Sequence, residues 1–351
     1  MVENLRLSKI FFTGLALCLF ASPVHSQASY YQGKTITMIM GGDPGGRGEM
    51  QIRALIPALK KYIPGEPHVV IQAMSGAAGR KAANHIYSVA KPDGLVIGAL
   101  GGGLIPGPVL GLPGSGYDLD KFIYLGSTDS GDAYSLFTRK EAGLDNLEKL
   151  RGATGIRIGA QSVGHSVHVS ARLFAYILGL KEPKFVFGFG GVELDLALFR
   201  GEVDARAHTI DIMLQRNPEV MEKGQVHIHA TITVPRGNHH PRYPDIPDLD
   251  IFTKTEQERK LLAMYRALIY PRWPYILPPA TPRELAATLR GAMAKALRDA
   301  EFQGEFNKIM GSRPTPLTAE QFDRAIKELP RDAETTKLYK LMADPGPLPP
   351  R

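Results

Sequence analysis

Residues 35–59, TITMIMGGDPGGRGEMQIRALIPAL, join an apolar run to a glycine-rich turn and then to an amphipathic pattern. The run from Ile36 to Met40 predicts a β-strand. After the turn, a helix with one apolar face is predicted by the spacing of Ile52, Leu55, Ile56 and Leu59. The first backbone N–H groups of such a helix lack partners within it, and its dipole favours negative charge there. The stretch therefore predicts a strand, a turn and a helix whose N-terminus can hold an anion.

The turn does not have the glycine spacing of a nucleotide-binding loop. Its glycines fit neither G-x-G-x-x-G nor G-x-x-x-x-G-K-[ST]; they are Gly41, Gly42, Gly45, Gly46 and Gly48. Glycine-rich turns are also common as plain connections between a strand and a helix in α/β folds. The turn is therefore either an anion site or a tight connection that binds nothing, and the residues alone leave both open.

The first 26 residues have the pattern of a secretory signal peptide. Arg6 and Lys9 precede an apolar stretch from Ile10 to Phe20, and a candidate cleavage site follows at Val24-His25-Ser26. The apolar stretch is too short to span a bilayer. We therefore expect an exported, soluble protein that is cleaved near Ser26.

The cysteine content and the charge exclude several kinds of site and partner. Cys18 is the single cysteine and falls within the predicted signal, after Leu17, where a lipoprotein signal has a small residue. The mature chain is therefore expected to have no lipid anchor, disulfide, catalytic thiol or thiolate metal site. The net charge of +7 becomes +6 on removal of residues 1–26, which carry two basic side chains and one acidic one, a net +1. The basic residues are dispersed, which argues against nucleic acid as a partner and fits a small acidic ligand.

The chain after the predicted signal is long enough for two domains of about 150 residues each. Strand-like runs alternate with helix-like ones along it, which predicts parallel, doubly wound sheets. The further predicted strands are 68–72, 95–100, 122–125, 135–138, 155–160, 184–189, 203–207 and 226–234, and the predicted helices are 49–62, 78–89, 166–178, 193–200, 256–267, 283–300 and 319–328.

Three other segments carry expectations of their own. Residues 101–116, rich in Gly and Pro, are predicted to form a flexible surface loop, and residues 344–351 a flexible tail. In the predicted strand 226–234, His227 and His229 share one face. No third ligand is evident, so a solvent-facing position is a better interpretation of this pair than a metal site.

Several short motifs occur in a fixed order along the chain. They are Pro44-Gly45-Gly46-Arg47-Gly48-Glu49, Met74-Ser75-Gly76-Ala77-Ala78-Gly79, Ala90-Lys91-Pro92-Asp93-Gly94-Leu95-Val96-Ile97, Gly116-Tyr117-Asp118, Gly159-Ala160-Gln161-Ser162-Val163-Gly164-His165-Ser166-Val167-His168, Gly201-Glu202-Val203-Asp204 and Pro244-Asp245-Ile246-Pro247. Their order and spacing resemble those of the tripartite tricarboxylate transporter (TTT) receptors, the TctC/Bug-type periplasmic solute-binding proteins. The corresponding family motifs read P-x-G-G-x-x-D, P-G-A-G-G, A-x-P-D-G-Y-T-L, L-P-Y-D, G-S-S-G-N-G-S-S-P-H, G-x-V-D and P-D-V-P. The resemblance covers nearly the whole chain after the predicted signal.

The resemblance implies an α/β fold of the type II periplasmic-binding-protein (Venus-flytrap) class, with a ligand cleft between two lobes. The first lobe is expected to comprise residues 27–132 and 235–343, and the second residues 133–234. A glycine-rich turn from each lobe would grip the ligand, and two facing helix N-termini would suit a carboxylate at each end. The implied ligand-binding residues are Asp43, Pro44, Gly45, Gly46, Arg47, Gly48, Glu49, Ser75, Gln161, Ser162, Gly164, His165, Ser166 and His208.

Several positions depart from the family pattern. Glu49 replaces an Asp and either supplies charge to the helix N-terminus or orients the ligand. Arg47 could pair with a ligand carboxylate or simply reach solvent. Gln161 and His165 replace small hydroxyl residues; the histidine either donates hydrogen bonds in their place or is an exposed turn residue. His168 is expected to pack or cap. These departures weaken the case for the citrate-like or malate-like ligands usual in the family.

Aromatic and histidine residues near the implied cleft are ambiguous. Trp273, the only tryptophan, lies in a Pro-rich stretch that resembles a family strand, and packing is a better interpretation than ligand stacking. His208 aligns with a position near the cleft, although a buried histidine with satisfied hydrogen bonds is the ordinary alternative. Phe189-Gly190-Gly191 matches a family Y-K-G-S turn without its lysine, which removes one potential cation.

The export signal and the resemblance together predict a monomeric, non-enzymatic receptor. It would capture a small organic anion, a mono- or dicarboxylate with aromatic ones included, and deliver it to a membrane permease of the TTT type. No cofactor, metal or nucleic acid is expected. A sensor that feeds a membrane signalling partner is an alternative that the sequence does not separate from transport. An exported hydrolase that uses His165 or His168 with Ser162 or Ser166 is weaker, because the chain has no G-x-S-x-G motif.

Overall fold

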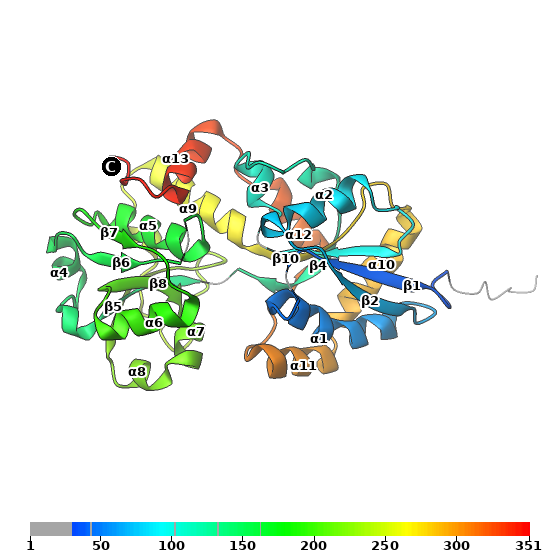
Figure 1. Ribbon diagram of the computed structural model, residues 1–351, viewed down its shortest axis with the longest axis horizontal. Helices are drawn as coiled ribbons and strands as arrows, with labels where there is room; N and C mark the ends of the chain where they lie inside the picture. The colour runs from blue at the N-terminus through cyan, green and yellow to red at the C-terminus, as the bar shows by residue number, and fades with distance from the viewer. Residues whose placement is uncertain (1–29, 43, 102, 132, 162) are drawn as a thin grey trace, which may run out of the picture.

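The computed structural model describes residues 30–351 except residues 43, 102, 132 and 162. Two α/β lobes lie side by side, and the chain passes between them more than once (Figure 1). The predicted signal peptide lies outside the described residues. Within the described part of the chain, none of the helices combines the length and the hydrophobicity needed to cross a membrane.

A six-stranded sheet forms the centre of the first lobe. Its strands are β1 (Thr35–Met40), β2 (His68–Ala73), β3 (Val96–Ala99), β4 (Ile123–Ser130), β10 (Pro271–Leu277) and β11 (Leu317–Thr318). They are hydrogen-bonded in the order β11-β4-β10-β3-β1-β2. Strands β1, β2 and β3 are parallel, so the turns that follow them meet at one edge of the sheet.

Helices cover both faces of this sheet. They are α1 (Arg47–Tyr62), η1 (Ala77–Gly79), α2 (Arg80–Ser88), α3 (Pro106–Val109), η2 (Leu119–Lys121), α10 (Arg283–Ala296), α11 (Ala300–Met310) and α12 (Ala319–Lys327). Met38 and Met40 belong to the core cluster of α1, α10 and α11, whereas Ile39 belongs to the cluster of α2 and α12. This division follows from the alternation of side chains along a strand.

A five-stranded sheet forms the centre of the second lobe. Its strands are β5 (Tyr134–Arg139), β6 (Arg157–Gly159), β7 (Lys184–Val186), β8 (Ala205–Thr209) and β9 (Val226–Ile232), in the order β7-β6-β8-β5-β9. Its nearby helices are η3 (Lys140–Ala142), α4 (Leu147–Gly152), α5 (Ser166–Leu178), α6 (Gly191–Arg200), α7 (Ile210–Arg216) and α8 (Pro218–Glu222). Strands β6, β7 and β8 are parallel, so their turns also meet at one edge.

The prediction of parallel sheets is wrong for three strands. Strand β10 runs antiparallel to β3 and β4, β11 runs antiparallel to β4, and β5 runs antiparallel to β8 and β9. Strands β10 and β5 lie next to passages between the lobes, where the chain enters each sheet from the opposite lobe. The predicted helix 283–300 is also wrong in its length. The Asp299 side chain accepts a hydrogen bond from the Glu301 N–H and caps a second helix, α11.

Part of the chain after residue 235 packs on the second lobe. Elements η4 (Leu249–Phe252), α9 (Glu256–Ile269) and α13 (Ala333–Ala343) contact α5, β9 or one another. Arg172 of α5 donates hydrogen bonds to the carbonyl groups of Leu341, Gly346 and Pro347, and Arg351 pairs with Glu258. This arrangement differs from the predicted boundary, which gave residues 235–343 to the first lobe and a flexible tail to residues 344–351. An amphipathic pattern specifies an apolar face but not the lobe on which it packs.

The chain crosses between the lobes at three places: between β4 and β5, between α9 and β10, and between α12 and α13 (Figure 1). The first two crossings lie together, since the Gly131 N–H donates to the Tyr270 carbonyl at 2.9 Å and Ser130 pairs with Pro271. The third is tied to the first lobe, where Arg331 pairs with Asp120 at 2.7 Å. Two separate connections therefore join the lobes.

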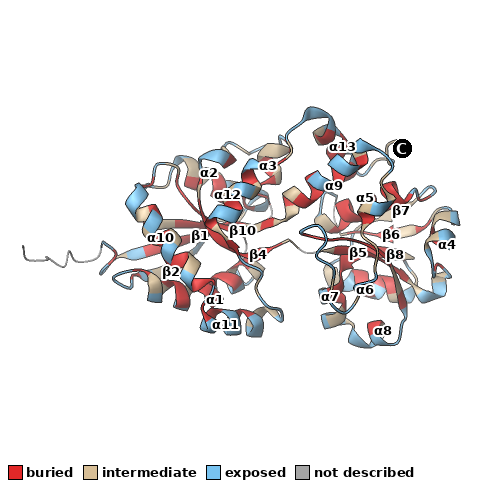
Figure 2. Ribbon diagram, turned by 180° about the vertical axis from the view of Figure 1, so that it is seen from behind, coloured by how far each residue is buried: buried red, intermediate tan, exposed pale blue. Residues whose placement is uncertain are grey.

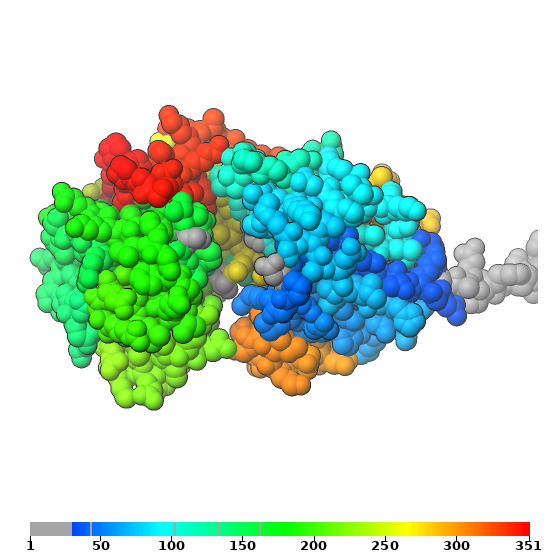
Figure 3. Space-filling view, in the orientation of Figure 1, coloured from blue at the N-terminus to red at the C-terminus, as the bar shows by residue number. Residues whose placement is uncertain are grey.

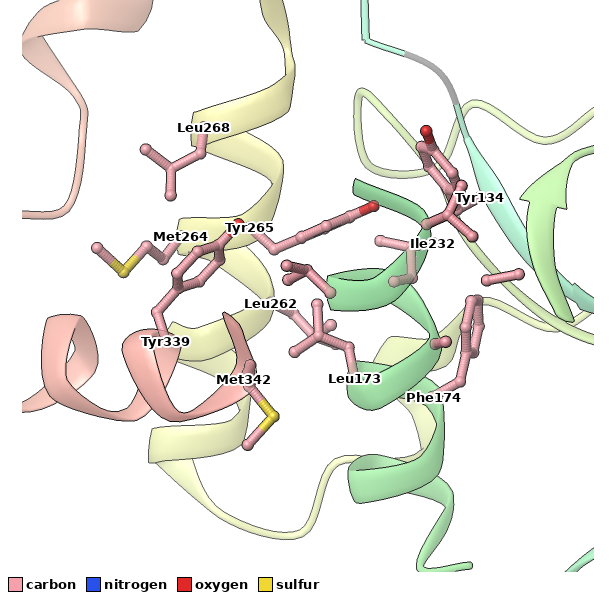
Figure 4. Close-up of a cluster of buried hydrophobic side chains, with 14 of the residues drawn as sticks. Tyr134, Leu173, Phe174, Ile232, Leu262, Met264, Tyr265, Leu268, Tyr339 and Met342 are labelled. Carbon is pink, nitrogen blue, oxygen red and sulfur yellow. The ribbon is translucent and has the colours of Figure 1, made fainter. Parts of the chain in front are cut away.

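The central strands of both sheets are buried between helices, whereas the edge strands β2 and β7 are partly exposed, and many exposed residues lie on the outer helix faces (Figure 2). Side chains of α5, α9 and α13 interlock in one cluster, with Tyr265 of α9 extending toward Tyr134 (Figure 4). Residues 101–116 do not form the predicted flexible surface loop, because Leu104, Ile105 and Leu110 are buried there around α3. These apolar side chains outweigh the Gly and Pro content.

The solvent-facing interpretation of the histidine pair in β9 is wrong for His229. This side chain is 4% exposed, and its Nε2 lies 2.7 Å from the Thr138 hydroxyl. Strand β9 pairs with β5, which places Thr138 beside it.

Candidate ligand-binding cleft

The turn that follows β1 is fastened to the end of β3 and to the turn that follows β2, at the edge of the first lobe. The Gly41 N–H donates to the Ala99 carbonyl at 3.1 Å, and the Ser75 hydroxyl donates to the Gly42 carbonyl at 2.9 Å. A Cβ atom at Gly41 would lie 3.1 Å from the Cα of Gly79, so the two turns are in close backbone contact. The predicted residue Ser75 therefore shapes the turn with its hydroxyl.

The charged residues at the start of α1 are engaged with protein groups. Glu49 accepts hydrogen bonds from the Gly45 N–H and from Arg53, both at 2.7 Å, and these bonds lower the pKa of its carboxyl. Arg47 donates to Asp129 at 2.9 Å. The Glu49 contacts favour its interpretation as a charge at the helix N-terminus. Arg47 fits neither of its two interpretations, because it pairs with a carboxylate of β4.

Trp273 packs against the same helix start. A Cβ atom at Gly48 would lie 2.7 Å from the Trp273 ring, and one at Gly101 would lie 3.2 Å from it. Trp273 itself has φ +49°, in the left-handed region that a bulky residue rarely adopts. The two glycines leave the space in which the indole lies between α1 and the end of β3.

Two histidines shape the corresponding turn of the second lobe. His165 is the N-cap of α5, and its Nδ1 accepts a hydrogen bond from the Val167 N–H at 3.2 Å. His168 Nδ1 accepts from the Gly164 N–H at 3.1 Å, and its ring packs against Phe185 and Phe187. Because each Nδ1 is an acceptor, Nε2 carries the proton when the ring is neutral. Gln161 and His165 thus stand in a turn built by imidazole acceptors rather than by serine hydroxyls.

Three basic residues lie behind this turn, and two of them, Arg206 and His208, are buried. Arg206 is fully buried and pairs with Asp195 of α6, and its Nη1 also donates to the Gly191 carbonyl at 3.4 Å. The Nε and Nη2 atoms of Arg206 have no hydrogen-bond partner among the described residues. Arg216 lies 3.8 Å from the same aspartate. His208 is 7% exposed; its Nδ1 accepts from the Thr209 N–H at 2.8 Å, and burial with nearby Arg206 and Arg216 holds its pKa far below the usual value.

A cavity of about 590 Å³ lies between the lobes. Figure 3 shows the hollow between the green and the blue halves of the molecule, with α9 visible behind it. First-lobe residues 78–112 and β10 form one side, and β5, the 163–169 turn, α9 and α13 form the other. Its size is within the usual range for small-molecule sites.

Three of the predicted site residues line this cavity: Gly164, His165 and Ser166. The Ser166 hydroxyl lies 2.8 Å from the Tyr134 hydroxyl. The other described candidates are not among the lining residues; they are Pro44, Gly45, Gly46, Arg47, Gly48, Glu49, Ser75, Gln161 and His208. Asp43 and Ser162 lie outside the described residues. The cavity thus adjoins the second predicted turn more closely than the first.

No protein-family model matches the sequence, and no curated protein sequence matches it either. Solved structures do match. A TctC solute-binding protein from Polaromonas superposes with a TM-score of 0.65 at 20% identity, over 89% of this chain and 98% of that chain. The chain has the fold of the TctC and Bug solute-binding proteins. The periplasmic binding protein BugD gives a TM-score of 0.57 at 19% identity, over 89% of this chain and 98% of that one. MatC from Rhodopseudomonas palustris, solved with bound malate, gives a TM-score of 0.54 at 18% identity, over 89% of this chain and 99% of that one.

The TctC/Bug fold confirms the two-lobe, type II architecture that the sequence predicts. Several residues that line the cavity are not among those predicted from the sequence. They are Arg80, Tyr134, Tyr265, Arg272 and Tyr339. Arg272 stands beside Trp273 and could have been noticed as a cation in the strand that resembles the family. Tyr339 carries no such signal, because it reaches the cavity from α13 at the far end of the chain.

The buried histidines of this TctC/Bug fold predict a pH-dependent stability. Burial lowers the pKa of His168 and of His229 to about 4, and that of His208 also lies below its usual value. The unfolded chain takes up these protons near pH 6.5, before the folded protein does. The free energy of unfolding should therefore fall as the pH drops from 6.5 to 4, by up to about 1.4 kcal/mol per pH unit for each such histidine.

Urea denaturation at pH 7, 6 and 5 measures this slope. The variant His168→Gln keeps an acceptor for the Gly164 N–H. It should make the slope of the unfolding free energy against pH shallower, because about one proton fewer is taken up on unfolding. The exposed variant His239→Gln should leave it unchanged. Equal slopes in the wild type and in His168→Gln would contradict the prediction.

Proposed function

We propose that this protein is a non-enzymatic, periplasmic receptor that captures a small organic anion between its lobes. The observation that carries this proposal is the cavity between the lobes, into which both contribute residues. Its lining includes Arg80, Arg272 and His165, and none of the described lining residues is acidic. A site of this kind favours a negatively charged ligand.

Electrostatics around the second turn support an anionic ligand. Enclosure by the cleft walls, together with the charge of Arg272, lowers the pKa of His165, so this ring acts as a neutral donor. Behind it, Arg206 and Arg216 share Asp195 as their acidic partner in the structure. Two arginines against one aspartate leave an excess of positive charge beside the N-termini of α5 and α6, whose dipoles add to it.

Capture would proceed by closure of the lobes around a bound anion. At the second turn, the Nε2–H of His165 would donate a hydrogen bond to a ligand carboxylate. The Arg272 guanidinium can pair with both oxygens of that carboxylate. Closure adds contacts from residues 78–112 of the first lobe. The ligand favours the closed state to the extent that it binds that state more tightly.

The TctC/Bug fold supports transport as the purpose of capture, because the matching structures are solute-binding proteins. MatC was solved with malate, itself an organic anion with two carboxylates. We extend this to delivery of the ligand to a membrane permease of the TTT type. The signal-like residues 1–26 fit the periplasmic location.

The site geometry gives no support to hydrolysis. A serine nucleophile needs its hydroxyl hydrogen-bonded to a histidine. The Ser166 hydroxyl instead lies beside the Tyr134 hydroxyl, and the Nδ1 atoms of His165 and His168 accept from backbone N–H groups. Ser162 lies outside the described residues.

Thermal denaturation with a panel of organic acids tests the receptor proposal. A true ligand at about 100 times its Kd should add about 2.7 kcal/mol to the free energy of unfolding and raise the Tm by several degrees. Arg272→Ala should weaken binding by roughly 10- to 100-fold, which corresponds to about 1.4–2.8 kcal/mol.

The matched control is Arg298→Ala, which removes an exposed arginine between α10 and α11. It should leave the affinity unchanged. If no acid raises the Tm, and Arg272→Ala behaves as Arg298→Ala does, the receptor proposal fails.

A further inference from the structure

Most of the cavity between the lobes is walled by hydrocarbon. The first lobe contributes the buried side chains of Leu104, Ile105 and Leu110, and α9 contributes Tyr265 and Leu268. Figure 4 shows Tyr265 and Leu268 on α9, with Tyr339 of α13 facing the same helix. A small, highly charged ligand would leave this apolar surface unused, whereas a hydrocarbon body would cover it.

Two exposed apolar side chains extend the wall across the cleft. Leu112 of the first lobe is 37% exposed and Val163 of the second lobe is 49% exposed, and both line the cavity. They come from opposite lobes, so a molecule between the lobes can touch both. Each would lose contact with water when an apolar ligand binds, which stabilises the complex.

Several polar groups lie together on the second-lobe side of the cavity. His165, Ser166 and Tyr134 adjoin one another there, and the charge of Arg272 acts on His165. On the other side, Arg80 donates its Nε–H to the Pro113 carbonyl at 3.2 Å, which fastens the 101–116 segment and leaves the guanidinium charged. We place the anionic group of the ligand at the second-lobe side, because a histidine and two hydroxyl groups are available there beside a cation.

We propose that the ligand is an amphipathic monocarboxylate, with its carboxylate at His165 and Arg272 and an aromatic or alkyl body against the wall of Leu104, Leu112 and Val163. This inference rests on the proposed receptor function and narrows its ligand class. It predicts a preference opposite to that of a site built for a short dicarboxylate, because a second carboxylate would be desolvated against hydrocarbon.

Isothermal titration with matched ligands tests the preference. The probes are 3-phenylpropanoate, octanoate, succinate and the neutral 3-phenylpropanamide. Either monocarboxylate should bind at least about tenfold more tightly than succinate, and the amide should bind more weakly than its acid. If succinate binds more tightly than both monocarboxylates, this inference is overturned while the receptor proposal stands. If none of the acids binds, or the amide equals its acid, the receptor proposal falls with it.

A pair of near-isosteric substitutions locates the apolar body. The double variant Leu112→Asn/Val163→Thr should weaken 3-phenylpropanoate about tenfold and leave succinate unchanged. Both side chains are exposed, so the variant should fold as the wild type does, which a Tm without ligand verifies.

The control makes the same two types of substitution at exposed positions outside the cavity. Val89→Thr/Leu196→Asn replaces two exposed apolar residues that do not line it and should not change the affinity for any probe. An equal loss in both double variants, or no loss in the cavity variant, would refute the placement of the apolar body.

Discussion

Replacing Asp195 by alanine should lower the free energy of unfolding by about 3–5 kcal/mol, one of the largest effects expected from a single substitution in this chain. Asp195 is 2% exposed and pairs with Arg206, which is fully buried. Burial lowers the pKa of Arg206 to about 10, so the guanidinium keeps its charge at neutral pH. Without its aspartate, that charge remains buried, and the weak 3.4 Å contact to the Gly191 carbonyl is its one remaining hydrogen bond among the described residues.

Urea denaturation at pH 7 measures the loss. The double variant Asp195→Ala/Arg206→Met should recover much of it, because the unpaired charge is then gone. Asp145→Ala, which breaks the exposed pair with Lys149, should leave the denaturation midpoint nearly unchanged. A double variant no more stable than Asp195→Ala would show that the buried charge is not the cause.

Gly126→Ala should lower the free energy of unfolding by roughly 2–5 kcal/mol, from backbone strain and overpacking together. Gly126 lies in β4 with φ +120°, which L residues rarely adopt. A Cβ atom there would lie 2.6 Å from the carbonyl oxygen of Leu317 in β11, a backbone atom that no rotamer change can move. Strand β11 must therefore shift away from β4.

The same substitution at helical glycines supplies the control. Gly291 in α10 and Gly304 in α11 have open space around the added Cβ. Gly291→Ala and Gly304→Ala should each stabilise the protein by up to about 1 kcal/mol, since alanine is the better helix former. Denaturation midpoints that fall in all three variants, or in none, would contradict this assignment.

The local structure around residues 35–59 could be predicted because its causes are local. Apolar spacing defines β1 and the buried face of α1, and the glycines between them permit the tight turn. The partner of Arg47 could not be predicted in the same way. Asp129 lies 82 residues along the chain and reaches Arg47 only because β4 and β1 share one sheet. A charged residue in a turn gives no sign of such a partner.

The candidate site shows the same limit. Gly164, His165 and Ser166 could be predicted through the resemblance to the TTT receptors, because that motif is continuous in the chain between β6 and α5. The hydrophobic wall of the cavity could not be predicted in this way, because it combines residues 104–112, α9 and α13, which are far apart in sequence. Residues 101–116 were assigned to a flexible loop on composition, although the burial of Leu104 and Ile105 depends on neighbours that composition cannot reveal.

The separate positions of the interlobe connections restrict how the protein can move. The paired crossings at Gly131 and Tyr270 form one attachment, and the segment between α12 and α13, held by Arg331 and Asp120, forms another. Two attachments apart from each other define a line, and only a swing about that line leaves both unstretched. Twisting or sliding of the lobes would strain at least one of the two attachments. We therefore expect opening and closing to be mainly a rotation about that line, and a bound ligand to select one angle of it.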